Sequence, residues 1–393
     1  MELWQPNLEG PQPLYRLTCR LLDAQGKEHD RASRRVGFRH VEWLPCAGAP
    51  PQADPWICVV NRRPVFLQGV NFPPLSALFA DLRREDYAAR LRQYADLGVN
   101  TLRINACQFL EREWFYDLCD ELGLMVWQEF PITSSGIENW PPEDENAIAE
   151  MARIARSFIE RRQHHASLIL WSGSNEQQGS LDGAKTGAGK PCDLSHPMLR
   201  RLGEIVDELD PGRRYIPTSP LGPRAGAAPA DFGRGLHWDV HGPNAGFDSL
   251  DEAERYWADD DALFRAEVYC SGASPSALIR KYAGDLPVFP PTFDNPYWTH
   301  PTPWWVDWPR VVAAYGRQPA DLEEYVTWSQ ALHARLIALC AKACKERFPR
   351  CGGFLLWSGH DTFPMPINTS LIDYDGNLKP AALALRAIWR GEE

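Results

Sequence analysis

The sequence predicts an α/β fold in which a (β/α)8 barrel follows a partial β-sandwich segment. From residue 65 onward, short apolar runs alternate with amphipathic helices, which is the pattern of parallel βα units. Eight such runs occur within about 325 residues, a length that fits a barrel with loop insertions. Before residue 65 the apolar residues instead alternate with period two, as they do in half-buried strands.

The N-terminal segment reads as strands and turns. Residues 14–21 alternate between apolar and polar side chains and are followed by a turn at residues 23–26. Residues 35–41 form a second short strand, and residues 57–60 form a third that enters a turn at residues 61–64. Three or four strands in about 60 residues are too few to close a two-layered sandwich. We therefore expect residues 1–64 to be part of a larger β domain and residues 65–393 to be the barrel.

The barrel segment divides into eight strands and five clear helices. The predicted strands are residues 66–71, 99–104, 124–129, 167–171, 214–217, 235–238, 263–266 and 353–357. The predicted helices are residues 84–97, 113–122, 146–162, 198–209 and 380–389. An open doubly wound sheet is the alternative, but no glycine-rich phosphate-binding turn follows any of the strands.

Composition narrows the class of partner. The net charge of −11 argues against a nucleic-acid or acidic-membrane partner, because both require a basic face. No apolar run approaches the roughly 20 residues of a membrane span. Sixteen Trp and twelve Tyr favour a carbohydrate ligand, because flat aromatic rings stack on sugar rings, although ordinary packing explains any single Trp equally well. The first residues lack the basic head and apolar core of a signal peptide, which favours the cytoplasm without settling the compartment.

Neither the cysteines nor the histidines predict a metal site. The ten cysteines contain no CxxC pair and several lie in apolar runs, so we expect reduced, buried thiols and no zinc site. The adjacent His164 and His165 lack acidic or cysteine ligands at a suitable spacing and predict a structural role near the bottom of the barrel. No cofactor is predicted.

Polar residues that directly follow the apolar runs are the candidates for chemistry, because active sites of such barrels lie where the strands end. Glu176 follows the fourth predicted strand and Glu267 follows the seventh, on opposite sides of the barrel mouth. Two carboxylates about 5 Å apart are what a retaining glycosidase needs. The other candidates at strand ends are Asn71, Arg103, Asn105, Glu129, Asn175, His237, His360 and Asp361.

Several collinear motifs make the sequence recognisable. The segment 171–176, Trp-Ser-Gly-Ser-Asn-Glu, resembles the acid/base motif of glycoside hydrolase family 2, and most closely its β-mannosidase branch. Residues 68–74, 114–127, 264–267 and 370–380 are similar to other barrel segments of that family. Residues 3–6 and 10–15 resemble the immunoglobulin-like domain that precedes the family's barrel, so the resemblance runs through nearly the whole chain.

The resemblance implies roles for individual residues. Glu176 would be the acid/base, with a raised pKa, and Glu267 the nucleophile, kept ionised by Arg103. Asn175 would bind the sugar 2-hydroxyl, and Trp357 would form part of the sugar platform. The remaining residues expected to bind substrate are Asn71, Trp171, His237, Trp238 and His241. Missing N-terminal β domains or a homo-oligomer are possible further contacts.

Three departures from the family pattern leave the glycone open. Asn105-Ala106-Cys107-Gln108 replaces Gly-rich residues, Tyr269 replaces a small residue, and Gly359-His360-Asp361 replaces the usual Asn-Asp after the last Trp. We expect a retaining exo-β-glycosidase that acts on β-mannosides. β-Glucosaminides and β-galactosides are the next candidate substrates. The alternatives are a truncated, non-catalytic carbohydrate-binding relic and an unrelated barrel enzyme with a metal or phosphate site.

Overall fold

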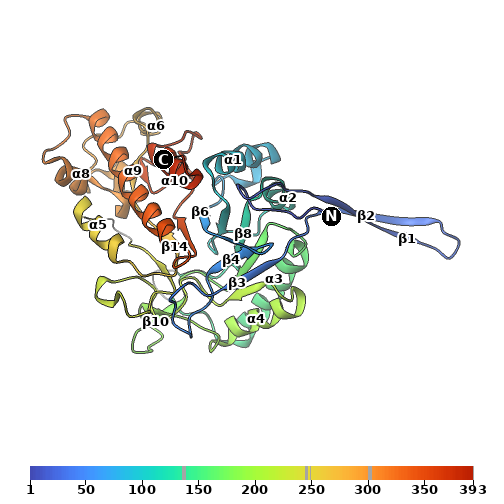
Figure 1. Ribbon diagram of the computed structural model, residues 1–393. Coiled ribbons are helices and arrows are strands. Elements are labelled where there is room, and N and C mark those ends of the chain that lie inside the picture. The colour runs from blue at the N-terminus through green and yellow to red at the C-terminus, as the bar shows by residue number, and fades with distance from the viewer. Residues whose placement is uncertain (135–138, 244–246, 248, 300–302, 393) are drawn as a thin grey trace.

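The computed structural model describes residues 1–392, apart from residues 135–138, 244–246, 248 and 300–302 (Figure 1). Eight parallel strands form the barrel in the order β12-β9-β8-β7-β6-β16-β14-β13, which confirms the predicted fold class. In chain order they are β6 (Leu67–Phe72), β7 (Thr101–Ile104), β8 (Met125–Glu129), β9 (Leu168–Ser172), β12 (Arg214–Ile216), β13 (Asp239–His241), β14 (Phe264–Val268) and β16 (Gly353–Leu356).

The barrel closes where the segment after β12 meets β13, through isolated residue pairs. Leu221 and Asp239 exchange two backbone hydrogen bonds of 3.0 Å, and the His241 N–H donates to the Ala225 carbonyl at 2.9 Å, whereas the other neighbouring strands share a ladder. The sixth strand therefore lies later than the predicted residues 235–238, because Gly235 takes a left-handed φ of 67° that an extended strand does not use. This displacement places His241, instead of His237, at the strand's carboxyl end.

Helices cover the outside of the barrel. They are α1 (Arg84–Leu97), α2 (Glu113–Leu122), α3 (Glu145–Arg162), α4 (Pro197–Leu209), α5 (Leu250–Asp259), α6 (Ser276–Tyr282), α7 (Pro296–Thr299), α8 (Trp308–Tyr315), α9 (Leu322–Glu346) and α10 (Pro380–Arg390). Asp144 caps α3 by accepting a hydrogen bond from the Ala147 N–H, and Gly98 ends α1 in a left-handed conformation. In the part of the chain that the structure describes, the loops contain 3₁₀ turns at Phe79–Asp81, Pro229–Asp231 and Pro303–Trp305.

A small antiparallel sheet fills the amino-terminal end of the barrel. It consists of β3 (Val41–Leu44), β4 (Ile57–Val60) and β5 (Arg63–Val65). Trp56, which directly precedes β4, packs on Trp127 of β8 and on Phe264 of β14, with ring centroids 5.9 and 4.7 Å away. Since these two strands lie on opposite sides of the barrel, Trp56 plugs its interior at this end. The site must then lie at the other end.

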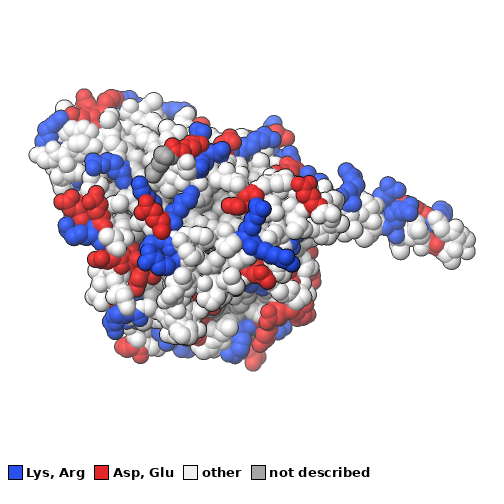
Figure 2. Space-filling view, viewed as in Figure 1, with Lys and Arg blue, Asp and Glu red and all other residues white. Residues whose placement is uncertain are grey.

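A two-stranded arm projects from the body (Figures 1 and 2). It pairs β1 (Tyr15–Leu22) with β2 (Glu28–Val36), and most of its side chains are exposed, including Leu17 and Leu21. Trp4 precedes the arm, is fully buried and donates from Nε1 to the Asp120 carbonyl at 2.7 Å, so the chain's first residues belong to the body. The domain boundary after residue 64 stays a prediction.

Two short antiparallel pairs complete the strands of the described residues. β10 (Gln178–Ser180) pairs with β11 (Gly189–Pro191), and β15 (Gly272–Ala273) pairs with β17 (Ile367–Asn368). Within the described residues, none of the helices combines the length and the apolar character that crossing a membrane would take.

Candidate active site

A cavity of about 480 Å³ opens at the carboxyl ends of the barrel strands. Its lining combines two carboxylates with amides, hydroxyls and several aromatic rings. These residues are Asn105, Cys107, Thr133, Ser134, Asn175, Glu176, Glu267, Tyr269, Trp304, Trp305 and Trp357. The cavity thus contains both carboxylates that the sequence singles out.

Glu267 is held rigidly on β14. Its carboxylate is buried and accepts hydrogen bonds from Arg103 of β7, from the Tyr269 hydroxyl and, at 3.3 Å, from Asn105 Nδ2. Burial raises the pKa of the Tyr269 hydroxyl well above its ordinary value, and the charge of Glu267 raises it further, so Tyr269 remains a donor. Three donors from separate positions fix both oxygens of this carboxylate.

Glu176 lies in a turn just beyond β9. Its φ of 51° is a left-handed conformation that few residues other than glycine adopt, and such strained positions cluster at functional sites. Its Oε1 lies 2.9 Å from His241 Nδ1, and its Oε2 accepts from Ser134 Oγ at 3.1 Å. The backbone N–H of Glu176 donates to the Ser219 carbonyl at 2.7 Å, which ties the strained turn to the neighbouring strand end.

His241 connects the two carboxylates. It is the register partner of Glu267 across β13 and β14, and its Nδ1 lies 3.6 Å from Glu267 Oε2 as well as 2.9 Å from Glu176 Oε1. Its Nε2 lies 3.0 Å from Ser219 Oγ, which donates to Asp239. Burial alone would lower the pKa of His241, but the negative charges of Glu267 and Glu176 outweigh burial and raise it.

The pKa of Glu176 corrects one expectation. Burial acts to raise it, yet the hydrogen bond and positive charge of His241, with help from Ser134, lower the pKa of Glu176 to about 2. The sequence predicts a raised pKa instead, because apolar walls and a second carboxylate were expected around it. The fold places an imidazole at that position, so in the free protein the proton lies on His241 and not on Glu176.

The separation of the two carboxylates is short. One carboxylate oxygen of Glu176, one of Glu267 and one nitrogen of His241 all lie within 4.8 Å of one another. Retaining glycosidases have carboxyl groups about 5–5.5 Å apart, whereas inverting enzymes need about 6.5–9.5 Å to admit a water molecule. The spacing matches the first class. These three side chains are also one of two groups, among the residues that the structure describes, whose atoms could hold a metal ion.

Arg103 organises the floor of the site. It is fully buried, and its guanidinium donates to Asn71 and Asn175 at 2.6 Å each, to Glu129 at 2.8 Å and to Glu267. Burial raises the pKa of Glu129 to about 7, although Arg103 acts in the opposite direction. Asn71 and Arg103 are register partners on β6 and β7, so strand pairing alone brings them together.

Aromatic rings form the cavity wall. Trp305 stacks on Tyr269 with ring centroids 5.8 Å apart, and Trp304 is 69% exposed. Trp357, directly after β16, is half-buried and lines the same cavity. Because an exposed indole beside polar groups suits the apolar face of a sugar, this wall fits a carbohydrate ring.

The structure brings together most, but not all, of the predicted site residues. Glu176, Glu267, Asn175 and Trp357 line the cavity. Arg103 and His241 lie directly behind them and contact Glu267 and Glu176, respectively. Asn71 reaches the site through Arg103 instead of through the cavity itself.

Three predicted residues lie elsewhere. Trp171 is buried outside the strand layer, where it stacks on Phe130 and donates to Asp210 at 2.9 Å. His237 bonds Asp261, and Trp238 lines a different cavity beside Leu221. Side chains alternate between the two faces of a strand, and Trp171 points outward. His237 and Trp238 precede β13, because the sixth strand lies later than predicted.

Several cavity residues were not predicted as site residues. Thr133 and Ser134 follow β8 in a loop whose sequence contains no recognisable motif, and Ser134 contacts Glu176 only because the loop folds back. Trp304 and Trp305 are visible in the sequence as part of the aromatic excess. In the sequence, Tyr269 stands out only as a departure from the family pattern. In the structure, its hydroxyl donates a hydrogen bond to Glu267, which explains why a tyrosine suits this position.

Comparisons with known proteins agree with this geometry. The model described as "Glycosyl hydrolases family 2, TIM barrel domain" matches residues 56–213, and the one described as "Glycosyl hydrolases family 2" matches residues 1–39. β-Mannosidase B of Thermothelomyces thermophilus is 26% identical over 95% of this chain and 45% of its own length. The chain therefore spans about half the length of the curated relatives it matches.

Solved structures give the same result. The crystal structure of β-D-mannosidase from Dictyoglomus thermophilum superposes with a TM-score of 0.81 at 25% identity, and covers 99% of this chain and 46% of that one. The exo-chitosanase of Amycolatopsis orientalis shares the fold, with a TM-score of 0.72 at 17% identity over 98% of this chain and 44% of its own. The barrel, the carboxylate pair and the two family models lead to the same assignment. The chain belongs to glycosyl hydrolase family 2 and resembles its β-mannosidases.

Proposed function

We propose that this chain is the catalytic part of a retaining exo-β-glycosidase that hydrolyses terminal β-mannosides through a covalent glycosyl-enzyme intermediate. The observation that carries the proposal is the facing pair of carboxylates, with oxygens of Glu176 and Glu267 within 4.8 Å of each other. That spacing leaves no room for a water molecule between nucleophile and sugar, so the carboxylate itself is the attacking group. A cavity of about 480 Å³ holds one or two sugar rings, which favours action at a chain end.

In the first step, Glu267 attacks the anomeric carbon while the leaving oxygen takes a proton from Glu176. Arg103 and Tyr269 donate hydrogen bonds to Glu267 and keep it aimed. Asn175, oriented by Arg103 at 2.6 Å, is available to bind the sugar 2-hydroxyl, where a hydrogen bond strengthens in the transition state. In the second step, Glu176 as a carboxylate takes a proton from water, which attacks the glycosyl-enzyme.

The proton for the first step comes from His241. In the free site, the Glu176 carboxylate is ionised and the neighbouring imidazole carries the proton, 2.9 Å from Glu176 Oε1. When substrate enters and excludes water, this proton moves along the contact to Glu176, which then acts as the acid. After Glu267 is esterified, its negative charge no longer acts on His241, and Glu176 remains free to act as the base.

Relatives supply the choice of sugar. The similar proteins from Thermothelomyces and Dictyoglomus are named β-mannosidases, and the latter structure is 25% identical over nearly the whole chain. We therefore propose β-mannose as the glycone. Trp304, Trp305 and Trp357 are available to stack on the sugar faces.

The test is turnover of a panel of aryl β-glycosides by the purified chain and by Glu176→Gln and Glu267→Gln. We expect hydrolysis of the β-mannoside, loss to background in Glu267→Gln, and a loss of about 10²–10⁴-fold in Glu176→Gln. Glu42→Gln on β3, an exposed carboxylate, is the control and should retain full activity. NMR should detect the β anomer of the released sugar first, because two displacements retain configuration.

Two outcomes would contradict the proposal. Turnover that survives Glu176→Gln on a substrate with a poor leaving group would remove the acid/base assignment. Saturable sugar binding by a folded chain, with no product after long incubation, would favour a carbohydrate-binding relic instead.

A further inference from the structure

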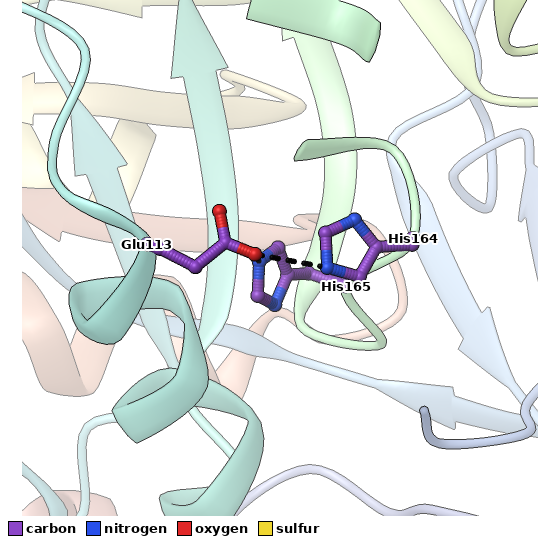
Figure 3. Close-up of side chains that lie close together, drawn as sticks. All are labelled: Glu113, His164 and His165. Carbon is purple, nitrogen blue, oxygen red and sulfur yellow. Dashed lines mark ion pairs between the residues drawn. The ribbon is translucent and has the colours of Figure 1, made fainter. Parts of the chain in front are cut away.

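Outside the active site, one cluster of metal-ligating side chains has no role in the proposed reaction. It consists of Glu113, the first residue of α2, and His164 and His165, which lie between α3 and β9. Figure 3 shows the Glu113 carboxylate directed at the two imidazoles. The sequence predicts no metal here because no acidic or cysteine ligand stands at a suitable spacing, but the fold brings Glu113 from 51 residues before His164.

The distances suit a small divalent ion. Glu113 Oε1 lies 3.2 Å from His164 Nε2 and 3.7 Å from His165 Nε2, and the three atoms fall within 4.8 Å of one another. Ligands of a tetrahedral zinc ion, at about 2.0–2.1 Å from the metal, lie about 3.3 Å apart. Both Glu113–histidine distances therefore lie within a few tenths of an ångström of that separation.

His165 is oriented as a metal ligand would be. It is buried, and its Nδ1 lies 2.7 Å from Asp120 Oδ2, on the same face of α2 as Glu113. A carboxylate on one ring nitrogen keeps the proton there and leaves a lone pair on the other, as in the carboxylate–histidine–zinc arrangement. His165 Nε2 has no hydrogen-bond partner and faces Glu113 Oε1 across 3.7 Å.

The surrounding charges leave one carboxylate oxygen available. Arg162 donates to Glu113 Oε2 and so anchors the carboxylate, which leaves Oε1 toward the histidines. Arg34 of β2 lies 3.8 Å from Oε1, but its side chain is 64% exposed and can turn into solvent.

We propose that Glu113, His164 and His165 bind one zinc ion, with water in the fourth position and Asp120 as the orienting group behind His165. Glu113 is 38% and His164 25% exposed at the side chain, so an ion and its water ligand can reach the site from solvent. A bound ion ties the start of α2 to the turn before β9, beside the base of the arm, and the site is structural, independent of glycoside hydrolysis.

The experiment is calorimetric titration of the chelator-treated full chain with Zn²⁺, with Co²⁺ absorption as a probe of tetrahedral geometry. We expect one equivalent to bind the parent chain, and that equivalent to be lost in His164→Gln and in Glu113→Gln. His40→Gln is the matched control, since His40 pairs with Glu42 at 3.0 Å on the surface without a third ligand. Glu267→Gln removes one member of the active-site cluster and should also keep the equivalent.

Thermal unfolding provides a second measurement. Zn²⁺ should raise the unfolding midpoint of the parent chain and of His40→Gln, and leave that of His164→Gln unchanged, because only a folded-state ligand stabilises. The proposal is overturned if the parent chain binds no Zn²⁺, or if the bound equivalent disappears only in Glu267→Gln. Activity on aryl glycosides distinguishes this site from the proposed function, because His164→Gln should hydrolyse them normally.

Discussion

The two carboxylates of the active site are held in opposite ways. Glu267 lies within a strand, is 4% exposed at the side chain, and is fixed by Arg103, Tyr269 and Asn105. Glu176 lies beyond its strand in a left-handed turn, is 28% exposed at the side chain, and is held by His241 and Ser134. Glu267 is therefore held in one position, whereas the side chain of Glu176 can adjust.

This difference corresponds to what the proposed mechanism asks of each group. A nucleophile must stay ionised and aimed throughout, so a buried guanidinium and a rigid strand serve it. An acid/base must take up and release a proton in each cycle, so a histidine that shares the proton serves it better than a fixed cation would. Substitutions on the Glu267 side should therefore cost more, and those on the Glu176 side should change pH and leaving-group dependence.

The largest effect is expected from Arg103→Met. Removing the guanidinium leaves Glu129 and Glu267 without their shared cation, which should destabilise the fold by about 3–5 kcal/mol. We expect kcat/KM to fall by roughly 10²–10³-fold or more, as when a preorganised charge-stabilising donor is lost. Chemical unfolding and steady-state kinetics measure the two effects separately.

A second substitution separates folding from catalysis in this variant. Glu129→Gln in the Arg103→Met background removes one of the two carboxylates that have lost their cation. Stability should therefore recover, while activity should not. The pKa of Glu129 is already raised by burial, so the unfolded chain releases that proton at lower pH than the folded chain. The stability cost of the single variant should therefore grow as pH rises between the ordinary carboxyl range and about 7, and beyond. Equal recovery of activity and stability would show that Arg103 acts only on the fold.

Seven of the eight barrel strands were predicted to within two residues, and only the sixth, β13, was misplaced. Residues 66–71, 99–104, 124–129 and 167–171 are continuous apolar runs, and the observed strands fall on them within two residues. β12 and β13 have three residues each, and their closure depends on Leu221 and Asp239, whose pairing is a property of the assembled barrel. Local sequence could not locate the sixth strand, and the misplacement of His237 and Trp238 followed.

Helices show the same division. α1 and α2 were predicted to the residue because each ends at a glycine after an amphipathic run. α9, with 25 residues, was not predicted, because His, Cys and Ser interrupt its apolar face. At the site, strand-end residues such as Arg103 and Glu267 could be predicted from position, whereas Ser134 and the pairing of His241 with Glu176 depend on how loops fold.

A moderate effect is expected from His241→Asn, which removes the shared proton. Since the pKa of His241 is raised by Glu267 and Glu176, its proton is lost only as pH rises through that raised value. The alkaline limb of the parent's pH profile should report this loss. In the variant, burial acts on Glu176 without the imidazolium, so the pKa of Glu176 rises and Glu176 itself carries the proton.

The alkaline limb of kcat/KM should therefore move to lower pH in His241→Asn, because a carboxyl group now sets it. The groups that face His241 are Glu176, Glu267 and Arg103, with Asp239 behind Ser219, and all remain in the variant. An alkaline limb that does not move would show that His241 positions Glu176 without supplying its proton.

The smallest effect is expected from Ser134→Ala, which removes one donor, 3.1 Å away, from Glu176 Oε2. The anion loses a hydrogen bond, so the pKa of Glu176 should rise and rates should change by no more than about tenfold. The sign should depend on the substrate. With a poor leaving group, proton donation limits the rate and the variant should match or exceed the parent chain. With an activated leaving group, proton removal from water limits the rate and the variant should be slower. Ser33→Ala on the exposed arm is the matched control, and a uniform loss across all leaving groups would mean that Ser134 holds the loop in place without tuning the acid/base.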